Sequence, residues 1–436
     1  MILRATFRNI LSFNDETSIS FVAGKSTQNP EHVSRAEKRD DISVLKSGIL
    51  YGANASGKSN TIKAIAALRQ LALGQKALHH INPFKLSLTS QQQSKIELEF
   101  KVGTRYFAYG VELSHKGIQE EWLYEINSRT DKPIFSRQFV DSEYHYEFKA
   151  IDGNLETKKF IEFLAQGTPA NKSFLSEYMK RNGKGLESIA VAFYWFADVL
   201  NIIFPETRYR GISINVEKDE DFASATKKLL GYFNTGIIDI RRFRISEGEV
   251  DLPREVIRDI ISSERKMTAI ASSDGLNIYF FERKESDEMV IYKQKAVHLN
   301  DNKEEVVFEM DEESDGSIRL LDFIPMLIDL SLNNRVYLID EIDRSMHPLL
   351  SQKLLEYYYS NLRSGLDTQL IFTTHEAFLL NSNSIRHDEI WFVEKDIAGA
   401  SHFTSLVEYK PRQDVLKGYM HGRYGAIPFF QTSAIS

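Results

Sequence analysis

The chain has 436 residues, a formal net charge of −7 and no cysteine. The missing cysteine excludes structural disulfides, thiolate nucleophiles and cysteine-ligated zinc, and the length favours two or three lobes. No apolar run approaches the ~20 residues of a membrane-spanning helix, and the N-terminal segment lacks the pattern of a secretion signal. We therefore expect a soluble cytoplasmic protein without a membrane partner, in which only a local basic groove would bind nucleic acid.

The first half of the chain predicts strands around one loop and one helix. Apolar residues alternate with polar ones over residues 2–21, which predicts two or more strands. A short apolar run at 48–51 leads into a glycine-containing loop, and helical spacing follows over 61–71. Alternating segments that predict a β-meander then follow at 96–100, 106–113 and 120–126.

The second half changes character twice. Apolar residues at three- and four-residue spacing predict helices from about residue 155 to 230. Strands return from residue 277, a helix is expected from Gly316 to about Leu332, and two apolar strands at 336–340 and 369–375 flank another helix. No sustained heptad pattern is present, so we expect no long coiled coil.

The loop at 52–60 has the spacing of a phosphate-binding loop, G-x-x-x-x-G-K-S. Its glycines let consecutive N–H groups face phosphate oxygens, and the following helix adds its positive N-terminal end. Lys58 is expected to contact the β- and γ-phosphates of ATP, and Ser59 to bind Mg²⁺. The predicted nucleotide-binding residues are Gly52, Asn54, Ala55, Ser56, Gly57, Lys58, Ser59 and Asn60.

Two later strands end in residues suited to phosphate chemistry. The strand at 336–340 ends in Asp340, a predicted Mg²⁺ ligand, followed by Glu341, a predicted general base for the attacking water. His375 ends the other strand, where a histidine can donate to a γ-phosphate. An ordinary strand-end histidine is the alternative when His375 is considered by itself.

Residues 314–317, Ser-Asp-Gly-Ser, stand just before an apolar helix. A serine there can simply cap the helix. A hydroxyl, a free N–H and a helix N-terminus can also grip a phosphate. Since one subunit has no obvious need for two grips on one γ-phosphate, Ser314, Gly316 and Ser317 are predicted to act in trans, on ATP held by a second subunit.

The order of these motifs resembles the ATPase head of the ABC type, in the branch shared with chromosome-maintenance and recombination-repair ATPases. The resemblance implies an α/β P-loop fold with an N-terminal β-rich lobe, a central mixed sheet and an inserted helical lobe. It also implies a signature motif at 314–317, although Asp315 replaces the usual glycine, and an inter-subunit loop that includes Asp343 and His347. The fold's magnesium-sensing glutamine is not placed, because Gln91–Gln93 lie in a polar loop.

A narrower resemblance is to bacterial AAA-family ATPases of the abortive-infection, AbiL/RloA-like group. It rests on the segments 81–86, 312–323, 338–348, 372–376 and 419–430. The resemblance implies an ATP- and Mg²⁺-dependent homodimer or higher oligomer that controls an effector encoded nearby, often a nuclease, in anti-phage defence.

Three ranges are predicted as domains: an ATPase half at 1–130, a mainly helical insertion at 131–275, and a second ATPase half at 276–436. Two alternative functions stay open at this point. A DNA repair or maintenance ATPase would grip DNA with the basic clusters at 179–185 and 241–244. A transporter's ATPase subunit is disfavoured by the altered signature and the large insertion.

Overall fold

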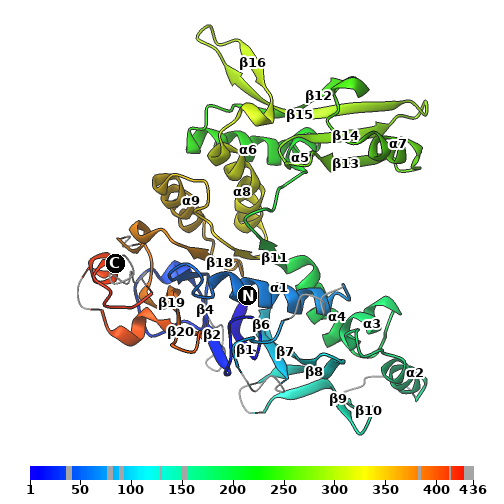
Figure 1. The fold of residues 1–436 in the computed structure, drawn as a ribbon, viewed down its shortest axis with the longest axis vertical. Helices are drawn as coiled ribbons and strands as arrows, with labels where there is room; N and C mark the ends of the chain where they lie inside the picture. Colours follow the sequence, from blue (N-terminus) through cyan, green and yellow to red (C-terminus); the bar gives the residue numbers. More distant parts are fainter. Residues whose placement is uncertain are drawn as a thin grey trace, which may run out of the picture. The chain divides into compact units, whose positions relative to one another are not determined.

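The computed structural model describes residues 1–35, 42–75, 82–87, 93–127, 130–148, 155–381, 384–411 and 414–426. Contacts divide the chain into two units (Figure 1). Unit 1 comprises 1–205, 333–343 and 359–436, and unit 2 comprises 206–332 and 344–358. The predicted domain boundaries after residues 130 and 275 do not coincide with these limits, and they stay a prediction.

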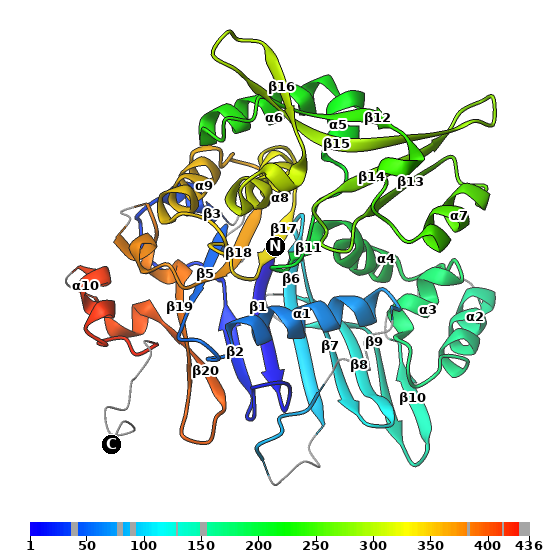
Figure 2. The same cartoon turned by 45° about the horizontal axis from the view of Figure 1, so that its top comes forward.

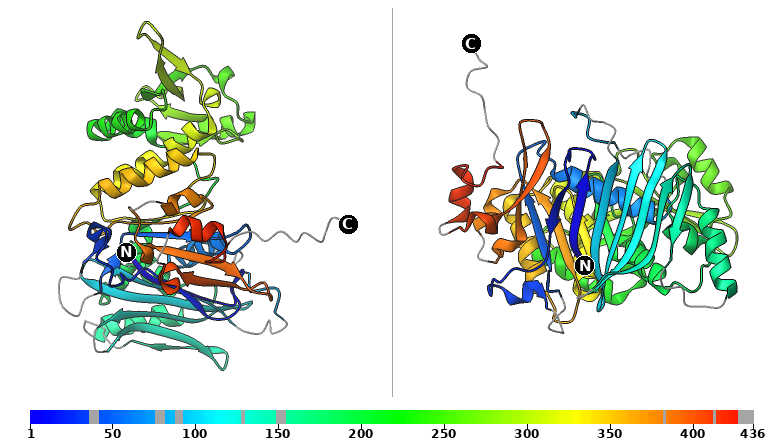
Figure 3. Two further views of the ribbon diagram at one scale, coloured as in Figure 1. Left: turned by 90° about the vertical axis from the view of Figure 1, so that its left-hand side faces the viewer. Right: turned by 90° about the horizontal axis from the view of Figure 1, so that it is seen from below.

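Unit 1 contains a seven-stranded antiparallel sheet of order β10-β9-β8-β7-β6-β1-β2 (Figure 3, right). Its strands are β1 (Ile2–Arg8), β2 (Thr17–Ser20), β6 (Ser94–Val102), β7 (Arg105–Ser114), β8 (Gly117–Ile126), β9 (Lys132–Val140) and β10 (Glu143–Glu147). Every second residue of β6 is buried from its first residue to Phe100, so one face of the strand lies in the core. The predicted meander is therefore present, and β9 and β10 extend it.

The second sheet of unit 1 contains the strands that precede the predicted phosphate loop, Asp340 and His375 (Figure 2). Its order is β11-β17-β18-β5-β19-β20. These strands are β5 (Ser47–Tyr51), β11 (Leu200–Ile203), β17 (Val336–Ile339), β18 (Gln369–Thr374), β19 (Ile390–Lys395) and β20 (Ser401–Ser405). All neighbours pair in parallel except β19 and β20. The carboxyl ends of five strands therefore meet at one edge.

One hydrophobic core joins the two sheets of unit 1. It includes Phe7 and Leu98 of the seven-stranded sheet, Leu50 and Leu338 of the parallel sheet, and Ile62 of α1. The helices of this unit are α1 (Lys58–Ala72), α2 (Leu155–Gln166), α3 (Phe174–Lys180), α4 (Glu187–Tyr194) and α10 (Val415–Met420). A short pair, β3 (Val33–Ser34) with β4 (Val44–Leu45), completes it. Burial of α1 on this core fixes the helix that begins the predicted nucleotide loop.

The prediction of helices from about residue 155 to 230 is only partly correct, because the apolar segment 189–204 is not helical throughout. Helix α4 ends in a π-helical turn at Trp195–Val199, and β11 follows as the edge strand beside β17. The sequence of β11 is Leu-Asn-Ile-Ile, a four-residue apolar run too short to show a period of its own. Its parallel partner β17 lies more than 130 positions further along the chain, so local pattern could not reveal this strand.

Unit 2 contains a sheet of order β12-β15-β14-β13, with β16 paired to β15 (Figure 1). The strands are β12 (Asp239–Ile245), β13 (Met267–Ala271), β14 (Ile278–Arg283), β15 (Met289–Leu299) and β16 (Glu305–Phe308). The helices are α5 (Ile212–Lys218), α6 (Glu220–Phe233), α7 (Arg254–Ser262), α8 (Asp315–Leu332) and most of α9 (Pro348–Ser360). At 18 residues, α8 is the longest helix in the described part of the chain.

Within the described residues, no helix is both long and apolar enough to cross a membrane.

A buried ion pair fastens α3 to the seven-stranded sheet. Glu121 of β8 and Arg137 of β9 are both fully buried, and their charged groups lie 2.9 Å apart. The Glu121 carboxylate also accepts the N–H groups of Phe174 and Leu175 in the first turn of α3, and the Tyr109 hydroxyl. The pair therefore links two strands to a helix start.

We predict that Arg137→Met lowers the free energy of unfolding by roughly 3 kcal/mol, because it leaves the Glu121 carboxylate buried without its cation. Urea denaturation measures this change. The control is Arg105→Met, which breaks the partly exposed pair with Glu125, and we expect it to cost less than about 1 kcal/mol. Equal losses in the two variants would contradict the role given to the buried pair.

Candidate nucleotide-binding site

The loop from Gly52 to Gly57 connects the buried strand β5 to α1. It has two left-handed residues, Ala55 with φ 63° and Gly57 with φ 118°. Such turns point successive N–H groups to one side of the loop. Asn54 and Ala55 are exposed at the tip, whereas Ser56 is buried. The loop therefore has the backbone form that the sequence predicted for phosphate binding.

Close packing requires glycine at positions 52 and 57, and the left-handed backbone is a second reason at Gly57. A Cβ on Gly52 would lie 2.4 Å from the Val393 carbonyl oxygen, and one on Gly57 would lie 2.2 Å from the Ser401 Oγ. Ser401 of β20 donates to the Ser56 carbonyl oxygen at 2.6 Å. Strand β20 thus contacts the loop at Ser56 and Gly57.

A chain of hydroxyl contacts continues from Ser401 to α1. Because the Ser401 hydroxyl donates to the Ser56 carbonyl oxygen, it accepts the Ser12 hydroxyl, with the two Oγ atoms 2.8 Å apart. The Asn60 amide donates to Ser12 Oγ at 2.8 Å. The side chain of Asn60, a predicted nucleotide-binding residue, is therefore used to position the first turn of α1. Its predicted contact with nucleotide stays a prediction.

Lys58 turns its ammonium group back onto the loop. Nζ donates to the carbonyl oxygens of Gly52 at 2.7 Å and Ala53 at 3.1 Å. Burial lowers the pKa of Lys58 to about 8, while the carboxylates of Asp340, Asp343 and Glu341 act in the opposite direction. A bound phosphate would stabilise the protonated form and raise this pKa.

The Asp340 carboxylate accepts two hydroxyl groups. Asp340 follows β17 and is buried, and its Oδ1 accepts Ser59 Oγ at 2.9 Å and Thr373 Oγ at 2.8 Å. Thr373 of β18 also accepts the Glu341 N–H at 2.7 Å. One threonine hydroxyl therefore connects the predicted metal ligand to the backbone of the predicted general base.

Glu341 has a left-handed backbone with φ 55°. This backbone conformation is unfavourable for residues other than glycine, so contacts with neighbouring groups must stabilise it. Two hydrogen bonds supply such contacts. The Thr373 hydroxyl accepts the Glu341 N–H, and the Thr373 carbonyl oxygen accepts the Ile342 N–H at 3.1 Å. The turn leaves the Glu341 side chain partly exposed at the edge where β5 ends.

His375 and Asp343 lie at the same edge. Asp343 Oδ2 accepts the His375 N–H at 3.2 Å. Within the described part of the chain, the buried Asp343 Oδ1 has no hydrogen-bond partner. Burial lowers the pKa of His375, and the charge of Lys58 lowers it further. A neutral imidazole at this position can donate one hydrogen bond to a phosphate oxygen.

The residues present suit Mg²⁺ held together with a nucleotide. Ser59 and Asp340 offer a hydroxyl and a carboxylate oxygen that already lie 2.9 Å apart. No group of three or more histidine, aspartate or glutamate side chains in the described residues could hold a metal alone. Mg²⁺ often needs only one or two protein oxygens beside phosphate and water, so this donor set fits the expectation.

The predicted signature residues belong to unit 2, at the start of α8. Ser314 is exposed, and its Oγ accepts the Ser317 N–H at 3.1 Å and lies 2.9 Å from the Ser317 Oγ. Ser314 therefore caps the helix, as the simpler interpretation of the sequence expected. A Cβ on Gly316 would lie 3.0 Å from the Ser345 carbonyl oxygen. The action of these residues in trans stays a prediction.

The family model described as "AAA domain, putative AbiEii toxin, Type IV TA system" matches residues 49–381. The chain belongs to this family. The match confirms the predicted relationship to AAA ATPases of the abortive-infection type, and it spans the phosphate loop, the acidic strand and His375. Membership of this AAA family implies nucleotide binding and the use of Mg²⁺.

Two solved structures are similar to this AAA-family chain. The SMC head domain from Thermotoga maritima is 13% identical with a TM-score of 0.40. The match covers 93% of this chain and 98% of the SMC head chain. An SMC head bound to the C-winged helix domain of ScpA is 14% identical with a TM-score of 0.45. The match covers 93% of this chain and 99% of that structure's chain. No curated protein matches the chain.

Sequence reasoning missed Thr373, Ser12 and Ser401. The double threonine before His375 stood in the sequence, but which hydroxyl faces Asp340 depends on the register of β17 against β18. Ser12 and Ser401 lie 389 positions apart, and no motif marks either of them. Ile81 and residues 427–430, which belong to the segments behind the family resemblance, lie outside the described residues, so their part of it stays untested. Gln91–Gln92 also lie outside the described residues.

We predict that Thr373→Val lowers kcat for ATP hydrolysis by about tenfold, because Glu341 loses the contact that holds its strained turn. Steady-state ATPase assays measure this, and the ATP Kd should change much less than kcat. Thr168→Val is the control, because Thr168 is also buried and donates only to the Leu164 carbonyl oxygen. Equal kcat values in the two variants would rule out the positioning role.

We predict that ATP affinity falls as the pH rises through about 8, the lowered pKa of Lys58. The protonated ammonium is present below this pH and is lost above it, and only the protonated form attracts phosphate. Equilibrium binding measured across this range tests the prediction. Lys58→Arg keeps its charge at high pH, so its ATP affinity should show no such fall, even if it is weaker throughout.

Proposed function

We propose that this AAA-family protein is an ATP-dependent switch: it binds and slowly hydrolyses ATP, self-associates around the nucleotide, and controls a partner effector in anti-phage defence. Catalysis would use Glu341 to polarise the attacking water and His375 to contact the γ-phosphate. Asp340 and Ser59 would hold Mg²⁺, and Lys58 would hold the phosphates. The connected hydrogen bonds of Ser59, Asp340, Thr373 and Glu341 are the observation that carries the enzymatic part.

Self-association is supported by the exposed start of α8. Ser314 and Asp315 face solvent at a helix N-terminus, where N–H groups and the helix dipole favour an anion. These residues belong to a different unit from the phosphate loop. A second copy would use Ser314, Gly316 and Ser317 to cover ATP, and Asp343 would lie in the inter-subunit loop.

The effector part rests on the family. The family description names a toxin and a toxin–antitoxin system. A slow ATPase cycle in such a system would time an association with a partner, and a nuclease is the partner class that the sequence resemblance favours.

DNA binding through the arginine cluster at 241–244 is not favoured. Arg241 contacts Asp239 and Glu305, and Arg244 contacts Glu288. Arg242 forms ion pairs with Glu217 and with Glu282. Lys180 and Arg181 both contact Glu177. At 241–244 the carboxylates outnumber the arginines, so that cluster offers phosphates little net attraction. At 179–185 one carboxylate faces two cations, so a positive charge is left there.

We predict that Glu341→Gln keeps ATP affinity but lowers hydrolysis at least about 100-fold, so that ATP-bound dimers accumulate. Sedimentation with and without ATP measures the dimers, and single-turnover assays measure hydrolysis. Glu143→Gln, on the exposed strand β10, is the matched control. Hydrolysis at the wild-type rate in Glu341→Gln would disprove the assignment of the base.

Ser314→Arg in the Glu341→Gln background separates binding from association. We expect unchanged ATP affinity, because the phosphate loop is intact, and loss of the ATP-dependent dimer, because a bulky side chain blocks the helix N-terminus. Asn302→Arg, also exposed in unit 2, should leave the dimer intact. Persistent dimers with Ser314→Arg would contradict the arrangement in trans.

Co-purification of the product of the neighbouring gene, with ATP and without it, tests the effector part. We expect nucleotide-dependent capture that Lys58→Ala abolishes. Capture that ignores nucleotide would exclude control by the ATP state.

A further inference from the structure

The segment 309–313 connects strand β16 to the predicted signature at the start of α8, and all three belong to unit 2 (Figure 1). The segment contains a short 3-10 turn at Met310–Glu312. Its first residue, Glu309, follows β16, and its last residue, Glu313, precedes Ser314. Because Glu313 and Ser314 are neighbours in the chain, the position of Glu313 decides where the signature serine lies.

Strand β15 holds both ends of this segment through polar side chains. At the first end, the Glu309 carboxylate contacts Lys293 Nζ at 2.8 Å and Lys295 Nζ at 2.5 Å. At the last end, Glu313 Oε1 lies 2.5 Å from His298 Nε2. The segment is therefore fixed to β15 as well as to β16, the strand that precedes it.

The contact between His298 and Glu313 is shielded from water. The Glu313 side chain is only 7% exposed, against 33% for that of Glu309. The His298 ring packs against the Phe308 ring of β16, with the ring centroids 4.5 Å apart. A carboxylate with so little access to water depends on a hydrogen-bond donor within the protein. Among the described residues, His298 is the donor that the Glu313 carboxylate has.

The start of α8 does not depend on this contact to be helical. Ser314 Oγ accepts the Ser317 N–H and caps the helix, and the side chains of Ile318 and Leu321 bury its first turns. Loss of the contact between β15 and Glu313 would therefore leave the helix formed. It would, however, free the exposed signature from its anchor.

We propose that His298 is a positioning residue for the contact in trans: through Glu313 it fixes Ser314 where ATP on a second copy meets the helix N-terminus. This role rests on the proposed self-association around ATP. A group that meets a ligand on another subunit binds more tightly when it is held in place beforehand, because less freedom is lost on association. His298 does not touch ATP itself. The alternative, that the contact only stabilises unit 2, is the other outcome of the test.

The test measures the dissociation constant of the ATP-bound dimer by sedimentation, in the Glu341→Gln background. His298→Phe keeps an aromatic ring against Phe308 but removes the ring N–H, and we expect it to weaken the dimer at least about tenfold. The ATP affinity of the monomer should not change, because the phosphate loop is intact. Arg244→Leu, which removes an exposed ion pair with Glu288 on the same sheet, is the matched control and should leave the dimer unchanged.

Variants of Glu313 separate positioning from stability. Glu313→Leu should weaken the dimer as much as His298→Phe, and the double variant should weaken it no further, because both changes break one contact. Glu313→Gln keeps an oxygen that accepts the His298 N–H, so it should retain most of the dimer affinity. Urea denaturation measures the stability of each variant. A purely structural role would lower the stability of His298→Phe and leave its dimer as tight as that of Arg244→Leu.

Ser314→Arg, in the same background, distinguishes a failure of this role from a failure of the arrangement in trans. If Ser314→Arg abolishes the dimer while His298→Phe and Arg244→Leu dimerise equally well, the role of His298 is wrong and the arrangement in trans is kept. If Ser314→Arg leaves the dimer intact, both are wrong. Additive losses in the double variant of His298 and Glu313 would also overturn the proposal, because His298 would then act by another route.

Discussion

The register of three parallel strands decides where every residue of the candidate nucleotide site lies. Ile339 of β17 pairs with Phe372 of β18, and Thr374 of β18 pairs with Tyr51 of β5. Each strand ends within a residue or two of these pairs, so the loops that follow emerge side by side at one edge. A shift of one residue in β18 would turn Thr373 to the opposite face. The contacts to Asp340 and Glu341 would then be lost.

The charged groups at this edge suit a ligand that has a positive part and a negative part, such as Mg²⁺ with a nucleotide. Three carboxylates act on Lys58, yet burial still lowers its pKa, and its ammonium group bonds to loop carbonyls. Asp343 keeps a buried oxygen without a partner in the described part of the chain, and Glu341 keeps a strained backbone. Costs of this kind persist where surrounding contacts enforce them, and they are typical of functional sites. Mg²⁺ with a nucleotide would supply the cation that the acids lack and the anion that Lys58 lacks.

The sequence alone allowed the local part of this arrangement to be predicted. A glycine-rich loop before a helix, and an apolar strand that ends in Asp340 and Glu341, are short-range signals with a direct physical meaning. Thr373 carried no such signal, because its role depends on a strand that pairs with β17 across more than 30 positions. Strand β11 was mistaken for helix for the same reason: four apolar residues acquire their structure from their partner. Long-range register was therefore the missing information in both cases.

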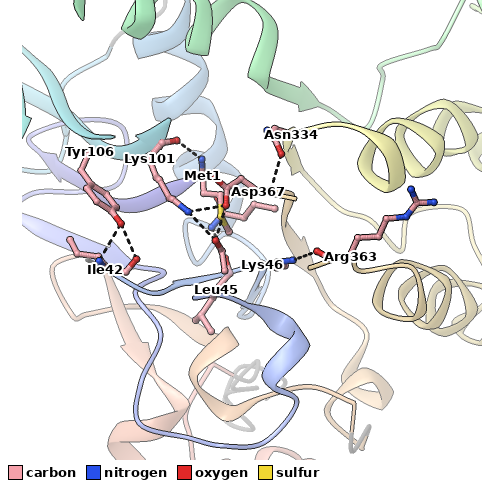
Figure 4. A network of polar contacts seen from close by, with 11 residues as sticks. Met1, Ile42, Leu45, Lys46, Lys101, Tyr106, Asn334, Arg363 and Asp367 are labelled. Atoms are coloured by element: carbon pink, nitrogen blue, oxygen red, sulfur yellow. Dashed lines mark hydrogen bonds and ion pairs between the residues drawn. The ribbon is translucent and has the colours of Figure 1, made fainter. Parts of the chain in front are cut away.

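A buried lysine lies near each end of β5, and the two differ in whether their surroundings suit a ligand. Lys46 and Lys58 lie before and after the same buried strand, and burial lowers the pKa of both. Lys58 lies in a loop whose sequence has the spacing of a phosphate-binding loop. The carboxylates near it include Asp340, which would bind the Mg²⁺ of the nucleotide. Lys46 sits in no motif, beside a second lysine that raises the cost of its charge and one carboxylate that reduces it. A methionine would fill the same volume without that cost, but it could not donate to the Arg363 carbonyl oxygen as the Lys46 ammonium group does (Figure 4). The charge of Lys46 therefore serves a contact within the protein, whereas that of Lys58 lies where a phosphate would bind.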